Sequence, residues 1–134
     1  MDFTGISYLA VVLAAVAGFA VGALWYGLLF GRAWMTALGK SREDLGGGAR
    51  PFVTSIIANL VMAWLLAGLI GHIGPVDPVS GLITAFFVWL AFIATTMTVN
   101  YAFQGARPAL LLIDAGHWLA VLLVMGLVIG LVGA

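Results

Sequence analysis

Four long apolar stretches dominate the chain, at about residues 6–30, 51–73, 78–103 and 108–132. Each stretch is long enough to supply the roughly 20 helical residues that cross a bilayer. The apolar residues run continuously instead of alternating at every second position, which is typical of membrane-spanning helices and not of barrel strands. The pattern therefore predicts an all-α fold: one transmembrane domain over residues 1–134, built as an antiparallel four-helix bundle that contacts the lipid bilayer.

Basic residues lie only in two of the connections between these stretches. Arg107 is in the third connection, and the loop 31–50 holds Arg32, Lys40, Arg42 and Arg50. The first and third connections of a four-helix chain share one side of the membrane, so all five basic residues share a side. The positive-inside rule then predicts cytoplasmic basic loops and outer termini.

Local signals mark helix boundaries and a repeat. Ser41–Asp44 has a helix-starting capping pattern, and Asp77 is placed to cap the third helix, which begins with Pro78. Gly-Ala-Arg-Pro occurs before both the second and the fourth helix, at residues 48–51 and 105–108. This spacing suggests a tandem repeat of a helical hairpin, as in transporters with parallel repeats.

Composition narrows the function classes. The chain is 64% hydrophobic and 7% charged, with zero formal net charge and no cysteine. These values exclude a soluble domain and disfavour nucleic acid as a partner. Two histidines and one membrane-embedded acid give no metal site, and no nucleophile–base pair is evident. We therefore expect no cofactor and no enzymatic activity.

Small residues recur at four-residue spacing on three helices. Such rows let helix backbones approach closely inside a membrane. They serve either packing within the bundle or a homo-oligomer seam, for which the fourth helix is the strongest candidate. The packing residues we single out are Gly18, Gly22, Ala63, Ala67, Gly126 and Gly130.

Asp114 is the only charged residue inside an apolar stretch, six residues after Pro108 and so about 9 Å into the fourth helix. A carboxylate at mid-bilayer costs about 2.5–3.5 kcal/mol on insertion scales, so it requires a partner or a function. Counting depth along each helix places other polar groups at a similar level on the cytoplasmic side. The predicted cluster contains Asp114, His117, Asn59, Asn100, Tyr26, Trp25, Thr96, Arg107 and Arg32.

Two interpretations of this polar layer stay open. Asp114 could bond Asn59, Asn100, Tyr26 or Tyr101, or pair with an arginine, and so fix the register of the bundle. Alternatively, it is the titrating group of a site open to the cytoplasm, with His117 as a proton relay. The second interpretation predicts a small transporter or channel-like protein. The first fits a non-catalytic accessory subunit that binds a partner membrane protein through its small-residue faces.

Three motifs resemble a family of small bacterial membrane proteins, domain of unknown function 1761. They are Trp25-Tyr26 through Phe30-Gly31 to Trp34, then Trp89 through Thr95-Thr96 to Asn100-Tyr101, and finally Ile113-Asp114-Ala-Gly-His117. The resemblance implies a four-helix integral membrane protein of this length and implies no activity. The family pattern has asparagine at the position of Asp114, which implies a need for a hydrogen-bonding group more than for a charge.

Overall fold

The computed structural model describes residues 3–133, and these residues form helices and loops with no strand. Two of the helical segments, η1 and η3, are π-helical, and η2 is a 3₁₀ turn. In chain order the elements are α1 (Tyr8–Leu24), η1 (Trp25–Leu29), α2 (Gly31–Leu38), η2 (Arg42–Asp44), α3 (Arg50–Ile73), α4 (Pro78–Val88), η3 (Trp89–Ala94), α5 (Thr95–Gln104) and α6 (Pro108–Val132).

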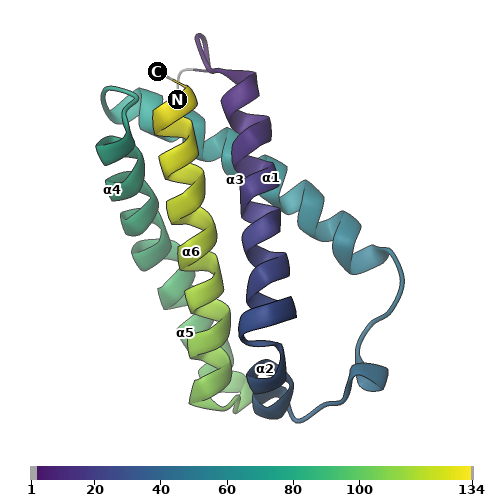
Figure 1. Cartoon of the computed structure of the whole chain (residues 1–134). Helices are drawn as coiled ribbons and strands as arrows, with labels where there is room; N and C mark the ends of the chain where they lie inside the picture. The colour runs from purple at the N-terminus through teal and green to yellow at the C-terminus, as the bar shows by residue number, and fades with distance from the viewer. Residues whose placement is uncertain (1–2, 134) are drawn as a thin grey trace.

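Within residues 3–133, four continuous helices are long and apolar enough to cross a membrane: Tyr8–Leu29, Arg50–Ile73, Pro78–Gln104 and Pro108–Val132. Their ends agree with the predicted stretches to within two residues. The prediction of an all-α membrane protein is confirmed. Figure 1 shows both chain ends at one end of the molecule, here called the terminal end, and α2 with the α5–α6 connection at the other, here called the basic end.

The boundary signals act as expected on the third helix. The Asp77 carboxylate accepts a hydrogen bond from the Ser80 backbone N–H at 2.8 Å, and Pro78 occupies the first turn of α4. Ser41 and Asp44 also bond, with the backbone N–H of Ser41 3.0 Å from a carboxylate oxygen, but they cap only the short 3₁₀ turn η2. Gly105 ends α5 in the left-handed conformation, with φ of 66°.

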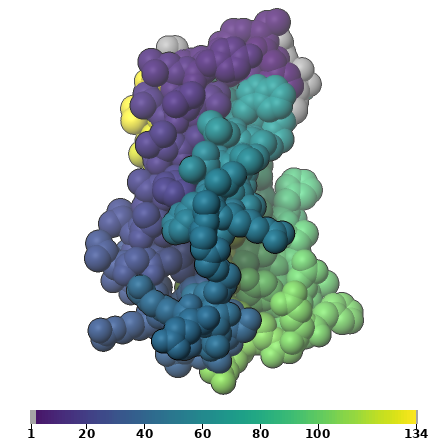
Figure 2. All heavy atoms as spheres, turned by 90° about the vertical axis from the view of Figure 1, so that its right-hand side faces the viewer, coloured from purple at the N-terminus to yellow at the C-terminus, as the bar shows by residue number. Residues whose placement is uncertain are grey.

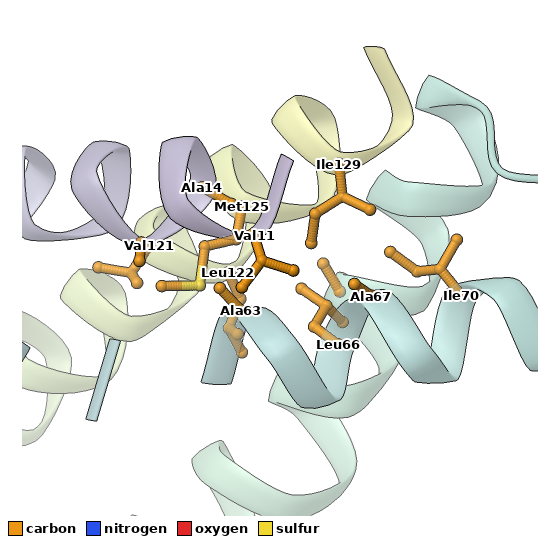
Figure 3. Close-up of a cluster of buried hydrophobic side chains, with 12 residues drawn as sticks. Val11, Ala14, Ala63, Leu66, Ala67, Ile70, Val121, Leu122, Met125 and Ile129 are labelled. Atoms are coloured by element: carbon orange, nitrogen blue, oxygen red, sulfur yellow. The ribbon is translucent and has the colours of Figure 1, made fainter. Parts of the chain in front are cut away.

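The helix α6 lies at the centre of the fold, packed along both α1 and α4, whereas α3 packs chiefly against α1. The apolar core lies in the terminal half, and the close-up in Figure 3 shows its side chains from α1, α3 and α6 meeting one another. The largest fully buried side chains of this core are Ile70, Val121, Met125 and Ile129.

Glycines set the closest helix contact. A Cβ on Gly81 of α4 would collide with the carbonyl oxygen of Gly126 in α6, and a Cβ on Gly126 would collide with that of Gly81. A Cβ on Gly130 would meet the backbone of Asp77 and Pro78. The idea that the small-residue row of α6 forms a homo-oligomer seam is therefore wrong, because α4 occupies that row within the chain.

The N-terminal half of α3 departs from the predicted regular bundle. Figure 1 shows it running away from α4, α5 and α6, and in Figure 2 its blue-to-teal atoms lie on the face turned to the viewer. Phe52 is 62% exposed and Ile57 is 57% exposed. The second and fourth spans, which follow the repeated motif, consequently pack differently. The fourth span, α6, packs closely against both α1 and α4, whereas α3 packs closely only against α1.

Candidate functional site

Two tyrosines from different helices hold Asp114. The Tyr26 hydroxyl, in η1, donates to Oδ1 of Asp114 at 2.6 Å, and the Tyr101 hydroxyl, in α5, donates to Oδ2 at 2.6 Å. The Asp114 side chain itself is half-buried. Both tyrosines were among the partners that the sequence suggested, and the carboxylate thereby joins three of the membrane-spanning helices.

Two tryptophans fix the backbone around this carboxylate. The indole N–H of Trp25 donates to the carbonyl of Ile113 at 3.0 Å, and that of Trp89 donates to the carbonyl of Ala115 at 2.8 Å. Trp25 opens η1 and Trp89 opens η3, so each donor is the first residue of a π-helical segment. Such segments are frequent at functional sites, because the wider turn re-aims the side chains that it carries.

The imidazole of His117 lies one turn beyond Asp114, within a set of aromatic rings. Its ring centroid is 4.9 Å from that of Tyr26 and 4.5 Å from that of Trp118. Nε2 faces Gly22, where a Cβ would approach to 3.1 Å, so the absent side chain of Gly22 leaves room for the ring. His117 is 7% exposed, and its Nδ1 has no hydrogen-bond partner among the described residues.

Asn59 does not join this cluster, contrary to the expected layer fed by four helices. It is buried in α3, and its amide donates to the Ser55 carbonyl at 2.8 Å. Its Oδ1 has no partner within residues 3–133 and lies beside Gly18 of α1. The cause is the direction of α3, which carries Asn59 along α1 and away from α5.

The remaining predicted residues also lie outside the tyrosine bridge. Asn100 is exposed on α5, and the exposed Thr96 hydroxyl donates to the carbonyl of Phe92 at 2.5 Å within its own helix. The guanidinium of Arg107 donates to the carbonyl of Thr36 in α2 at 2.7 Å. Arg32 lines a hollow at the basic end. The polar cluster is therefore smaller than depth counting predicted.

Trp89 is the site residue that sequence reasoning missed. Its position, 15 residues before the end of the helix at Gln104, places it about 22 Å deep on a straight helix, far from the predicted level of Asp114. Its partner Ala115 is close to the level of Asp114. The sequence signal that could have identified it is the indole N–H of Trp89, within the Trp89-x-x-Phe92 motif. A membrane-embedded indole N–H requires a hydrogen-bond acceptor.

Asp114 lines neither of two hollows on the described part of the chain. One, of about 170 Å³, lies at the terminal end and is lined by residues such as Ser7, Ala10, Ala67 and Gly71. The other lies at the basic end. Within residues 3–133 no group of three or more His, Asp or Glu side chains is placed to hold a metal ion.

Comparison with known proteins assigns the chain to a family. A profile of the family described as protein of unknown function, DUF1761, matches residues 9–130, nearly the whole chain. No curated protein and no solved structure matches it. The matched range contains both tryptophan–carbonyl contacts and the tyrosine bridge to Asp114, and the chain belongs to the DUF1761 family of membrane proteins.

Proposed function

We propose that this protein is a small transporter or channel-like protein of the bacterial inner membrane, and that it binds a proton or a small cation at Asp114. The observation that carries the proposal is the missing counter-charge. Within residues 3–133 the carboxylate accepts two tyrosine hydrogen bonds and forms no ion pair, and the nearby Arg107 is turned to a backbone carbonyl.

The remaining acceptor capacity of Asp114 supports this proposal. An ionised carboxylate has about four lone-pair sites, and the two tyrosines use two of them. A carboxylate left charged in hydrocarbon is costly, and a proton or a bound cation removes that cost. The rings of Trp25, Tyr26 and Trp118 pack around the neighbouring His117, and aromatic faces attract cations.

The orientation belongs to the same proposal. All five basic residues lie in or at the end of the α1–α3 and α5–α6 connections, so the positive-inside rule puts the basic end in the cytoplasm and the termini outside. Asp114 then lies in the cytoplasmic half of the membrane. We infer that its ligand arrives from the cytoplasm and that release to the outside requires the apolar terminal half to rearrange.

Reconstituted vesicles test the proposal. Proton flux into vesicles loaded with a pH-sensitive dye, and uptake of labelled methylammonium, are measured under an imposed potential for the wild type, Asp114→Asn and Glu43→Gln. Glu43 is an exposed acid outside the spans and serves as the matched control. We expect flux of one of the two ions, its loss in Asp114→Asn and its retention in Glu43→Gln. Equal flux in both variants would rule out Asp114 as the binding group.

The direction of α3 favours a second candidate, an accessory subunit of a larger membrane complex. Its N-terminal half presents exposed apolar side chains on several sides, among them Phe52, Val53, Ile56 and Ile57. A partner helix lying there would bury them. Purification from native membranes in mild detergent, with and without Ile57→Asn, tests this candidate: a stoichiometric partner lost in the variant supports it, and isolation of the chain alone opposes it.

A further inference from the structure

A second feature, separate from Asp114, is the shallow hollow at the basic end, with a volume of about 650 Å³. Three of its lining side chains are cationic, and they come from α2 and from the loop that follows it. The lining residues are Arg32, Met35, Thr36, Gly39, Lys40, Ser41 and Arg42. Two acids, Glu43 and Asp44, directly follow Arg42 in the sequence, and neither lines the hollow. Both the backbone N–H and the hydroxyl of Ser41 bond to Asp44. The hollow is thus lined by positive charge.

The backbone brings these three cations together. Arg32 and Thr36 are one turn apart on the exposed face of α2. Gly39 then ends the helix with φ of 72°, a left-handed conformation that turns the chain back, so that Lys40 and Arg42 line the same hollow as Arg32. A side chain at position 39 would strain this turn.

The helix α2, which forms part of the hollow, packs against the rest of the bundle. Ala37 is buried, and the ring of Trp34 lies 5.2 Å from that of Tyr26 in an edge-on contact. The Arg107 guanidinium bonds the Thr36 carbonyl at 2.7 Å, which joins α2 to the start of α6. Figure 1 shows α2 nearly end-on, lying across the basic end of the molecule as an interfacial helix does.

Exposed apolar side chains lie just before α2 in the sequence, at the end of the first span. Leu28 is 79% exposed and Leu29 is 65% exposed, and both precede α2 at the end of the first span. An amphiphile would therefore meet hydrocarbon-compatible side chains on one side and three cations on the other. Free inorganic phosphate would use the cations and leave the leucines uncovered.

We propose that this hollow binds the phosphate group of an anionic phospholipid, with Arg32, Lys40 and Arg42 on the headgroup and the acyl chains along Leu28 and Leu29. Arginine forms paired hydrogen bonds with phosphate oxygens, and basic pockets at the membrane surface hold anionic headgroups. Trp34 of α2 contacts Tyr26, and Tyr26 bonds Asp114, so the helix that carries Arg32 is connected to the candidate site through two side-chain contacts. The lipid site does not depend on the proposed transport, since none of its cations touches Asp114.

Native mass spectrometry of the full chain in detergent tests the lipid site. The probes are dioleoyl phosphatidylglycerol and dioleoyl phosphatidylcholine, and the variants are Arg42→Gln in the hollow and Arg50→Gln outside it. Each variant removes one positive charge from the segment 31–50 and leaves four basic residues in the chain, so the net charge is matched. We expect preferential binding of one phosphatidylglycerol, weakened about fivefold by Arg42→Gln and less than about twofold by Arg50→Gln.

Two controls separate the alternatives. Equal weakening by the two variants would show diffuse attraction to the loop and overturn the site, as would equal binding of the two lipids. Addition of inorganic phosphate, matched against chloride for ionic strength, distinguishes the sources of the phosphate group. Displacement of the lipid by phosphate alone would show a soluble-anion site and overturn the lipid assignment; unchanged binding supports it.

Discussion

Trp25 and Trp89 donate to carbonyls on either side of Asp114, at Ile113 and Ala115 of α6. The two indoles come from η1 and η3, and each is the first residue of a π-helical segment. A helical carbonyl has a second lone pair that accepts such a bond without breaking the helix. Two helices thereby hold the backbone of the α6 segment that carries Asp114, in addition to the tyrosines that bond its carboxylate.

Replacing either indole with a phenyl ring tests this fixation. Each of Trp25→Phe and Trp89→Phe removes one hydrogen bond and should lower the free energy of unfolding by about 1 kcal/mol. Thermal unfolding in detergent measures the change. Trp64→Phe is the matched control, because Trp64 stacks on Phe3 at 4.7 Å and is 40% exposed. If Trp64→Phe lowers the unfolding temperature as much as the two site variants do, the loss of ring volume, and not the loss of the hydrogen bond, explains their lower stability.

The glycine contact between α4 and α6 gives a sharper stability test. Gly81→Ala and Gly126→Ala each place a methyl group against a backbone carbonyl of the facing helix. A backbone carbonyl cannot move aside by changing a side-chain rotamer. We expect each to destabilise the protein by about 1–3 kcal/mol, the range for overpacking. Gly71→Ala is the control, since the nearest atom to its new Cβ is Val76 Cγ2 at 3.9 Å, an ordinary contact. Similar unfolding temperatures for all three variants would contradict the close approach of the two backbones.

The positions of the four spans along the chain were predictable, because the length of an apolar stretch can be read directly from the residue types. The cap at Asp77 and the turn at Gly105 are also local, and both act in the structure as their residue types require. Tyr26 and Tyr101 could be named as partners of Asp114, because a membrane carboxylate requires donors at its own depth. These inferences need only helix rise and side-chain chemistry.

The direction of α3 and the two π-helical segments could not be read from the sequence. Depth counting assumes straight, parallel helices, and it therefore grouped Asn59 with Asp114 and left Trp89 out. The tilt of α3 depends on which small residues of neighbouring helices pack together. In the same way, the spacing of Gly126 and Gly130 does not reveal whether they pack against α4 or against another chain. Tertiary contacts decide both.

The cap at Asp77 predicts a pH dependence. The Ser80 backbone N–H bonded to the carboxylate holds the pKa of Asp77 below its usual range. A carboxyl group whose pKa is lower in the folded state stabilises the fold above its unfolded pKa, about 3.9 for aspartate, and loses this effect as the pH falls through the folded value. Asp77→Ala should therefore lower the unfolding temperature at pH 7, and the difference from wild type should shrink below about pH 4.

The amide variant gives the internal control for that experiment. An asparagine at position 77 still accepts from the Ser80 N–H and has no carboxyl proton to bind, so its stabilising effect should not change across the same pH range. A gap between wild type and Asp77→Ala that stays constant from pH 7 to about 3 would show that the Asp77 charge plays no part.

The tyrosine bridge predicts that a side chain able to bond both phenols can replace Asp114. In Asp114→Asn, Oδ1 accepts from one tyrosine and Nδ2 donates to the other, so stability should stay within about 1 kcal/mol of wild type. Asp114→Leu leaves both hydroxyls without this partner, and we expect a loss of about 2–5 kcal/mol, because two partly buried groups lose their bonds.

A double-mutant cycle separates the bond from the charge. Tyr26→Phe should cost about 1.5–3 kcal/mol in the wild type, where the bond is to a carboxylate, and clearly less in the Asp114→Asn background. The same cycle with Tyr101→Phe reports on the other oxygen. If Asp114→Asn unfolds as readily as Asp114→Leu, the tyrosines need the charge itself. If Asp114→Asn is stable and its vesicles lose flux, the fold requires only the hydrogen bonds, and the negative charge belongs to the ligand site.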